Sequence, residues 1–421
     1  MIELFAGVGG FRLAAEKHGI QTILWNQWEP STKTVQHAHD VYRFRFKDSG
    51  YDERFSNKNI STVSDEICKA PEYANPTFLV GGFPCQDYSV AKSATSALGL
   101  EGKKGVLWWD ILKLAQELNP RYLVLENVDR LLKSPTANRG RDFAIMLASL
   151  GKIGYQVEWR VITASDFGSF QKRRRIFIVA SKTLTKKKHS QSSQTAARYL
   201  QADGLLAKAF PVSRLLAPVS NFEVGTDPLA VEDDYIAIKG KSRFLDSGLF
   251  VGGQVFTAST LPRVERLRVL REVLVDRKSD LVEIPEEYFI PNTQYSAWEG
   301  HKFGGKRERT TKDGFTYNYT EGSMAFPDDL DRPSRTILTG EGGPTPSRFK
   351  HAVATPSGRI RRLLPEELEQ LNGFPPGWTE TGINGKQSAN RRAFFMGNAL
   401  VVGVVERIFA SITEGEGRDA N

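Results

Sequence analysis

The chain has 421 residues, which at about 150 residues per domain predicts two or three domains, or one large domain with an insertion. Its formal net charge is +8, without a strongly basic arm or tail, so a surface for an anionic partner has to be assembled by folding. Two cysteines exclude a disulfide framework and a cysteine-ligated zinc site, and neither a membrane-spanning apolar run nor a signal peptide is recognisable, so we expect a soluble intracellular protein.

The first 181 residues predict strands that alternate with helices. Strands are expected at 2–5, 22–26, 77–82, 121–126, 155–162 and 175–180, with helices at 11–17, 106–118 and 141–150. This alternation predicts an α/β domain with a doubly wound, mostly parallel sheet covered on both faces. Such a fold binds ligands at the carboxyl ends of its strands.

The pattern changes after Ser181. A polar stretch around Lys186–Lys188 predicts a linker, and the region from about 205 to 345 is irregular, with short β-like runs at 235–239 and 249–256. One helix is expected there over Arg263–Arg277, and two more follow at 365–371 and 399–412. We therefore expect one unit over 1–184, a second, smaller, loop- and β-rich domain over 185–345, and a C-terminal segment over 346–421 that returns to the first unit.

A glycine-rich turn, Phe5–Gly10, follows the first predicted strand and precedes the first helix. Its glycines allow a ligand to approach the main chain, although a plain tight turn has the same composition. The second strand ends in Asn26–Glu29, with polar side chains and an indole where ribose and adenine would lie. Because Phe11 and Arg12 follow the last glycine directly, the spacing disfavours a dinucleotide.

Three further features stand at strand ends or next to a strand. Cys85 follows the third strand, and taken alone it is more typical of a small buried hydrophobic residue. Glu126 ends the next strand at the same edge of the sheet, where helix capping is the structural alternative. Arg173 and Arg175 precede the last strand of the block and share one side by alternation, although a basic run is usually a solvated surface.

In this order the motifs resemble those of the DNA (cytosine-5) methyltransferases, most closely the bacterial restriction–modification type. The resemblance covers residues 1–181 and about 332–421, everything except the middle region. It is carried by FAGVGG (5–10), NQWE (26–29), NIS (59–61), GGFPCQ (81–86), KGVL (104–107), ENV (126–128), QKRRR (171–175) and GNALV (397–401). The implied fold is that of the S-adenosylmethionine-dependent methyltransferases, with residues 1–184 catalytic and residues 185–345 recognising the DNA target.

The resemblance implies a reaction through a covalent intermediate. Cys85 would add to C6 of cytosine, so that C5 becomes nucleophilic enough to take a methyl group from S-adenosyl-L-methionine. Glu126 would hydrogen-bond N3 and the exocyclic amine, and of Arg173 and Arg175 one would contact O2 while the other holds the site. A thiol with a pKa of ~8.5 and a carboxyl with a pKa of ~4.3 would both need a shifted pKa to act near neutral pH.

The resemblance also implies the methyl donor's site, without a metal. Where the family usually has an acid for the ribose, this chain has Gln27, so either binding is weaker or Glu29 substitutes. Asn59 likewise replaces a common Asp. The implied cofactor-binding residues are Phe5, Gly7, Val8, Gly9, Gly10, Gln27, Trp28, Glu29, Asn59, Ile60, Phe83, Leu107, Asn398 and Ala399.

The target base cannot be reached inside a duplex, so the resemblance implies base flipping. Gln86, Ser89 and Thr336 are the expected DNA contacts, and residues 302–312 with nearby aromatic residues are either groove contacts or a charged loop. We expect a monomer in the bacterial cytoplasm, at the nucleoid, with double-stranded DNA as substrate and a cognate restriction endonuclease as functional partner. The alternatives are an RNA (tRNA) cytosine-5 methyltransferase, a catalytically silent DNA-binding homologue and, more distantly, a nicotinamide-dependent oxidoreductase.

Overall fold

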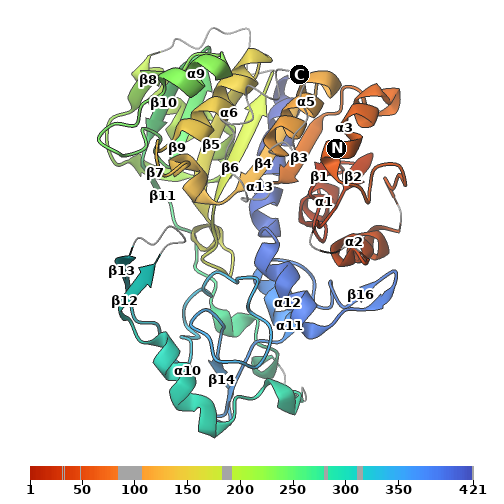
Figure 1. The fold of residues 1–421 in the computed structure, drawn as a ribbon, viewed down its shortest axis with the longest axis vertical. Coiled ribbons are helices and arrows are strands. Elements are labelled where there is room, and N and C mark those ends of the chain that lie inside the picture. Colours follow the sequence, from red (N-terminus) through yellow and green to blue (C-terminus); the bar gives the residue numbers. More distant parts are fainter. Residues whose placement is uncertain are drawn as a thin grey trace.

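The structure is a computed structural model that describes residues 1–30, 32, 34–47, 49–83, 107–182, 192–278, 283–310 and 316–419. Figure 1 shows a larger and a smaller body, and a nine-stranded sheet forms the centre of the larger one. The strand order is β2-β1-β3-β4-β6-β5-β9-β10-β8. The bounds are β1 Ile2–Leu4, β2 Leu24–Asn26, β3 Phe78–Gly82, β4 Tyr122–Asn127, β5 Gln156–Thr163, β6 Arg174–Ser181, β8 Ser220–Glu223, β9 Ser247–Val251 and β10 Gln254–Ala258.

The predicted α/β class is confirmed, and each of the six strands predicted up to residue 180 has a counterpart in the sheet. The sheet is mixed, however. β2, β1, β3 and β4 pair in parallel, whereas every pairing from β4–β6 to β10–β8 is antiparallel. The physical reason is connection length: β5 reaches β6 through a short loop, which suits an antiparallel pair, and a parallel pair needs a longer crossover.

Helices cover both faces of the sheet. Alternation in β3 sends Phe78 and Val80 into one hydrophobic cluster and Leu79 into the other. The first cluster includes residues of α1 (Gly10–Glu16), α2 (His37–Phe46), α8 (Leu205–Ala209) and α13 (Val402–Asp419). The second includes residues of α3 (Ile60–Lys69), α5 (Leu107–Leu118), α6 (Arg141–Lys152) and α9 (Pro228–Asp234).

The sheet continues beyond the boundary predicted at residue 184. β9 pairs with β5, with Phe250 opposite Val157, and β10 and β8 extend the sheet from there. α7 (Ser193–Arg198), the π-helical turn η4 (Tyr199–Asp203) and a two-stranded sheet of β7 (Val212–Leu215) and β11 (Thr260–Pro262) also belong to this end of the larger body. β8, β9 and β10 therefore belong to the sheet of the larger body.

The helix predicted over Arg263–Arg277 is wrong. Arg263 and Glu265 donate their backbone N–H groups to Pro211 and Asp166, so this part of the chain is extended instead of bonding to itself. Only two short 3₁₀ turns follow, η5 (Leu270–Glu272) and η6 (Val275–Arg277). The β-like run at 235–239 is not a strand either, since it ends in a turn closed by an isolated bridge between Ile238 and Lys241.

The smaller body has a small core of its own, which includes Ile290, Trp298, Ala352 and Ile360. Its elements are α10 (Tyr295–Lys302), β12 (Gly305–Thr310), β13 (Thr316–Glu321), β14 (Val353–Ala354) and β15 (Ile360–Arg361), with the 3₁₀ turns η7 (Glu286–Tyr288) and η8 (Asn292–Gln294). In the larger body, the remaining 3₁₀ turns are η1 (Pro71–Tyr73), η2 (Asp129–Lys133) and η3 (Ala164–Phe167).

The last helix of the chain lies on the larger body. After α11 (Pro365–Leu371), β16 (Thr381–Gly382), β17 (Gly385–Lys386) and α12 (Ala389–Asn398), helix α13 packs on α1 and α8 (Figure 1). The helical stretch 389–415 is long and apolar enough to cross a membrane by composition, but 61% of its most apolar window is buried inside the protein. That burial is what a core helix of the larger body shows.

Candidate active site

Glu126 lies at the carboxyl end of β4, directly opposite Gly82 of the parallel neighbour β3. A side-chain carbon added to Gly82 would lie 3.3 Å from the Glu126 Oε2 atom, so the carboxylate stands over the glycine. Cys85 comes three residues after Gly82, within 84–106, outside the described residues. β3 therefore ends next to the Glu126 carboxylate.

Arg175 pairs with Glu126 across the antiparallel β4–β6 ladder. Its Nε atom is 3.1 Å from Glu126 Oε1, and the two side chains are only 18% and 13% exposed. Glu126 is opposite Phe177 in the register, so the contact is diagonal, to the residue two positions away on the same face. Burial raises the pKa of Glu126, and the charges of Arg175 and Arg173 oppose that rise.

Arg173 has a different environment, because its guanidinium is bonded to main-chain carbonyls. Nη1 donates to Ile337 O at 3.2 Å and Nη2 to Gly397 O at 3.0 Å, and the residue is only 2% exposed. Burial lowers the pKa of Arg173 to about 9, helped by the nearby charge of Arg175. Arg173 thus joins the entrance of β6 to the C-terminal segment.

Asn127 is a site residue that the sequence reasoning did not single out. Its Nδ2 atom donates to the carbonyl of Phe83 at 3.0 Å, and its Oδ1 atom accepts from the Val128 N–H at 2.8 Å. Phe83 is the last described residue before Cys85, and its ring packs near Trp108. Asn127 thus fixes the main chain just ahead of Cys85, and its place inside the ENV motif was the available signal.

The glycine-rich turn lies at the carboxyl end of β1, and several of its residues have unusual backbone angles or little space for a side chain. Phe5, Gly7 and Gly9 have positive φ angles of 54°, 56° and 91°. At Gly9 an added side-chain carbon would lie 2.4 Å from the ring of Phe46, whereas at Gly7 nothing lies within 4 Å. The turn is therefore closed on the Phe46 side and open at Gly7.

Gln27 and Glu29 have different partners. The Gln27 Oε1 atom accepts the Gly7 N–H at 2.7 Å, so the amide oxygen is already used to hold the glycine turn. The Glu29 carboxylate accepts from Thr32 Oγ1 at 3.2 Å and is half-buried, as is the neighbouring Trp28. β2 ends at Asn26, so strand alternation does not set the direction of either side chain.

The other residues predicted for the cofactor site lie at the ends of elements. Asn59 caps α3 by accepting the Ser61 N–H at 3.2 Å, and Ile60 begins that helix. Leu107 begins α5, while Asn398 and Ala399 end α12. An added side-chain carbon at Gly10 would lie 3.0 Å from Leu400, which places the 397–401 motif beside the glycine turn. The motif from the end of the chain thus meets the motif from its start.

Of the predicted DNA contacts, Gln86 and Ser89 lie outside the described residues. Thr336 is half-buried and donates its hydroxyl to Lys172 O at 3.0 Å, next to Arg173. In the hairpin of β12 and β13 the register sets Arg307 opposite Tyr319 and Arg309 opposite Tyr317. Contacts of this hairpin with DNA stay a prediction.

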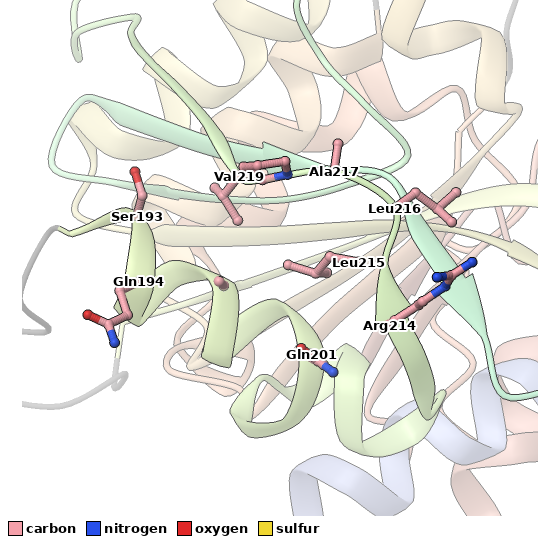
Figure 2. Close-up of a pocket in the computed structure, with 10 residues that line it drawn as sticks. Ser193, Gln194, Gln201, Arg214, Leu215, Leu216, Ala217 and Val219 are labelled. Atoms are coloured by element: carbon pink, nitrogen blue, oxygen red, sulfur yellow. The ribbon is translucent and has the colours of Figure 1, made fainter.

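A surface pocket of about 580 Å³ lies away from these residues, between α7 and the segment around β7 (Figure 2). Arg214 is its one charged lining residue, and the lining brings no acid, base or nucleophile together. The pocket is near β8, at the opposite edge of the sheet from β1 and β2. The pocket is therefore separate from the ion pair of Glu126 and Arg175.

The family model for C-5 cytosine-specific DNA methylases matches residues 1–414. The Type II methyltransferase M.Sau3AI of Staphylococcus aureus is 43% identical over 415 residues, which cover 97% of this chain and 94% of that protein. The Type II methyltransferase M.NgoBI of Neisseria gonorrhoeae is 35% identical over 178 residues, 42% of this chain and 49% of that protein.

Two solved structures share the fold. The methyltransferase EhMeth of Entamoeba histolytica has a TM-score of 0.55 at 14% identity, covering 99% of this chain and 98% of its own. The Dnmt2 methyltransferase of S. pombe has a TM-score of 0.55 at 13% identity, with the same coverage. The match of the family model over nearly the whole sequence, with the relative of 43% identity, shows that the chain belongs to the C-5 cytosine-specific DNA methylase family.

Proposed function

We propose that this protein transfers a methyl group from S-adenosyl-L-methionine to C5 of a flipped-out cytosine in duplex DNA, with Cys85 as nucleophile. The observation that carries the proposal is the buried pair of Glu126 and Arg175, positioned where β3 leads into Cys85. A thiolate added to C6 forms an S–C6 bond and pushes electrons toward N3 and C5. C5 then takes the methyl group, and S-adenosylhomocysteine leaves. Loss of the C5 proton to a base breaks the S–C6 bond, which restores the aromatic ring and releases the Cys85 thiolate.

Glu126 is the residue assigned to N3. Its raised pKa increases the protonated fraction, so the carboxyl can donate to N3 while negative charge develops in the ring. Arg175, whose guanidinium already contacts Glu126, is assigned to O2 of the same base. Arg173 is assigned the positioning role, because its Nη1 and Nη2 atoms donate to the carbonyls of Ile337 and Gly397.

The residues around the glycine turn suit S-adenosylmethionine, which supplies an electrophilic methyl group when bound. Phe5 and Trp28 are partly exposed rings at the ends of β1 and β2, and Gly7 leaves open space between the turn and solvent. We assign the ribose to Glu29, because the Gln27 oxygen is engaged by Gly7. Two aromatic faces and a carboxylate match an adenosine better than a pyrophosphate-containing cofactor.

Covalent trapping tests the proposal. Duplex DNA carrying 5-fluorocytosine should form an adduct that survives denaturation, because fluorine at C5 blocks the final elimination. The adduct should be absent with Cys85→Ser and should persist with Cys68→Ser. Cys68 is half-buried on α3, and burial raises the pKa of its thiol to about 11. An adduct that persists in Cys85→Ser would refute the assigned nucleophile.

The substrate and partners follow from the family and the Type II relatives. We infer duplex DNA as substrate, a cognate restriction endonuclease as functional partner, and a monomer acting at the nucleoid in the bacterial cytoplasm. Incorporation of label from the methyl donor into duplex DNA or into tRNA distinguishes a DNA methyltransferase from the RNA alternative. Bisulfite sequencing of DNA from cells that express the protein would identify the methylated cytosine and its context.

A further inference from the structure

Trp378 reaches the glycine turn from the other end of the chain. Its indole Nε1 donates to the carbonyl of Val8 at 2.8 Å, and the residue is 9% exposed. The same peptide unit is held from its other side, because the Gly9 N–H donates to Ala6 O at 2.9 Å. The orientation of the Val8–Gly9 peptide therefore depends on one bond within the turn and one bond from Trp378.

The loop that carries Trp378 is built around a buried carboxylate. Glu369 is fully buried and accepts the backbone N–H groups of Gly377 at 2.6 Å, Trp378 at 3.1 Å and Thr379 at 2.9 Å. Arg392 of α12 neutralises the same carboxylate at 2.9 Å. Three converging N–H donors fix the path of the loop, so the indole is preorganised rather than free to swing away.

A second contact ties this loop to the helix behind the turn. Arg45 of α2 donates to the carbonyls of both Gly377 and Trp378. The ring of Phe46, its neighbour on α2, lies 5.7 Å from the Trp378 ring and fills the space beside Gly9. Trp378, Phe46 and the glycine turn thus form one packed unit at the predicted methyl-donor site.

We propose that Trp378 is a positioning residue for the methyl donor, acting through the Val8 carbonyl. The inference rests on the proposed binding of S-adenosylmethionine at the glycine turn. Without the indole N–H, the Val8 oxygen loses its buried partner and the Val8–Gly9 peptide can rotate, which changes the main-chain surface presented to the donor. The role concerns affinity for the donor, not the chemical step at Cys85 and Glu126.

The test compares Trp378→Phe with Trp298→Phe in the full-length protein. Phenylalanine keeps an aromatic ring and removes the indole N–H in both. Trp298 is the matched control, because it is fully buried in the smaller body and its Nε1 has no partner among the described residues. Binding of S-adenosylmethionine is measured by equilibrium dialysis, together with methyl transfer at saturating donor and hydrogen exchange of the peptide covering residues 5–16.

We expect Trp378→Phe to weaken donor binding about 3- to 10-fold, the range for one lost hydrogen bond, and to speed hydrogen exchange in the turn. The kcat at saturating donor and the KM for DNA should stay within about twofold of the wild type, as should every parameter of Trp298→Phe. Equal donor affinity in the two variants would overturn the inference, as would a loss confined to kcat. Wild-type protein that binds no donor would instead overturn the proposed function.

Stability is controlled separately. Thermal unfolding of both variants shows whether Trp378→Phe only loosens the fold, and Trp378→Tyr provides a larger ring if the phenylalanine variant melts below the assay temperature. If donor affinity follows the melting temperature across the three variants rather than the loss of the Val8 contact, the positioning role is wrong.

Discussion

Glu126 and Arg175 form an ion pair in which the carboxylate and the guanidinium are both largely buried, with Nε and Oε1 3.1 Å apart. Burial favours the neutral carboxyl and the arginine favours the charged one, and the outcome is a pKa above the ordinary value. The raised pKa therefore increases the fraction of Glu126 that is protonated at a given pH.

Replacing the carboxyl should affect the rate rather than donor binding. Glu126→Gln should lower kcat by about 10²- to 10⁴-fold, the usual contribution of a general acid, with the affinity for S-adenosylmethionine unchanged. Asp129→Asn is the control, since Asp129 pairs with Arg174 on the surface, 2.9 Å away. Methyl transfer at saturating donor and DNA measures both. An equal loss of rate in the two variants would contradict the assigned role.

The pH profile follows from the direction of the Glu126 pKa. Because the active form is protonated, kcat should fall as pH rises through the raised pKa of Glu126. The side chain in Glu126→Gln cannot lose a proton, so the residual kcat of this variant should not fall over the same pH range. The effect is measured by comparing kcat across pH in the wild type and the variant. If kcat of Glu126→Gln still falls as pH rises, the titrating group is another residue.

The two arginines should respond differently to substitution. Arg173→Ala leaves the carbonyls of Ile337 and Gly397 without their donors and should lower stability by about 1–3 kcal/mol. Arg175→Lys should fold normally but lower kcat, because an ammonium cannot reproduce the fork of a guanidinium. Urea unfolding measures the stability of both variants, and steady-state kinetics measures their kcat. The assignment is reversed if Arg173→Ala proves stable and Arg175→Lys unfolds.

Glu3 should make stability depend on pH. Burial raises its pKa to about 7 from 4.5, against a hydrogen bond from Tyr42 Oη at 2.7 Å. Between these pH values Glu3 holds a proton in the folded protein that it loses in the unfolded chain. The stabilisation that Glu3 contributes is therefore complete below pH 4.5 and is lost as pH rises through 7. Glu3→Gln should remove on the order of 3 kcal/mol of this dependence. Urea unfolding at several pH values measures it, with the exposed Glu66→Gln as control.

Glu29 should hold the ribose of the donor. Glu29→Gln should raise the KM for S-adenosylmethionine several-fold, because a charge-assisted hydrogen bond is replaced by a neutral one. Gln27→Glu preserves the acceptor for the Gly7 N–H, and it should leave the KM unchanged or lower it. If Glu29→Gln behaves like wild type while Gln27→Ala loses donor binding and keeps its stability, Gln27 is the ribose ligand.

The sequence by itself predicted the six strands of the first 181 residues and the helices α1, α5 and α6, because their periodicity depends on neighbours a few positions away, but it did not predict α2 and α3. It also predicted that Glu126 and Cys85 lie at one edge of the sheet, since parallel strands end on the same side. Of the two, Glu126 is among the described residues, and it lies opposite Gly82 of β3. Local pattern failed over Arg263–Arg277, where the backbone N–H groups of the extended part are taken by distant carbonyls instead of the next turn of a helix.

Only the tertiary structure separated Arg173 from Arg175, because identical side chains two positions apart differ only in what surrounds them. The same holds for Trp378, which lies 370 residues from Val8 and carries no local signal of the contact. The antiparallel direction of the strands after β4 likewise depends on connection length. The sheet is extended there because β9 pairs with β5 and β10 pairs with β9. Contacts of this kind depend on the packing of whole elements, and no short window of sequence contains that information.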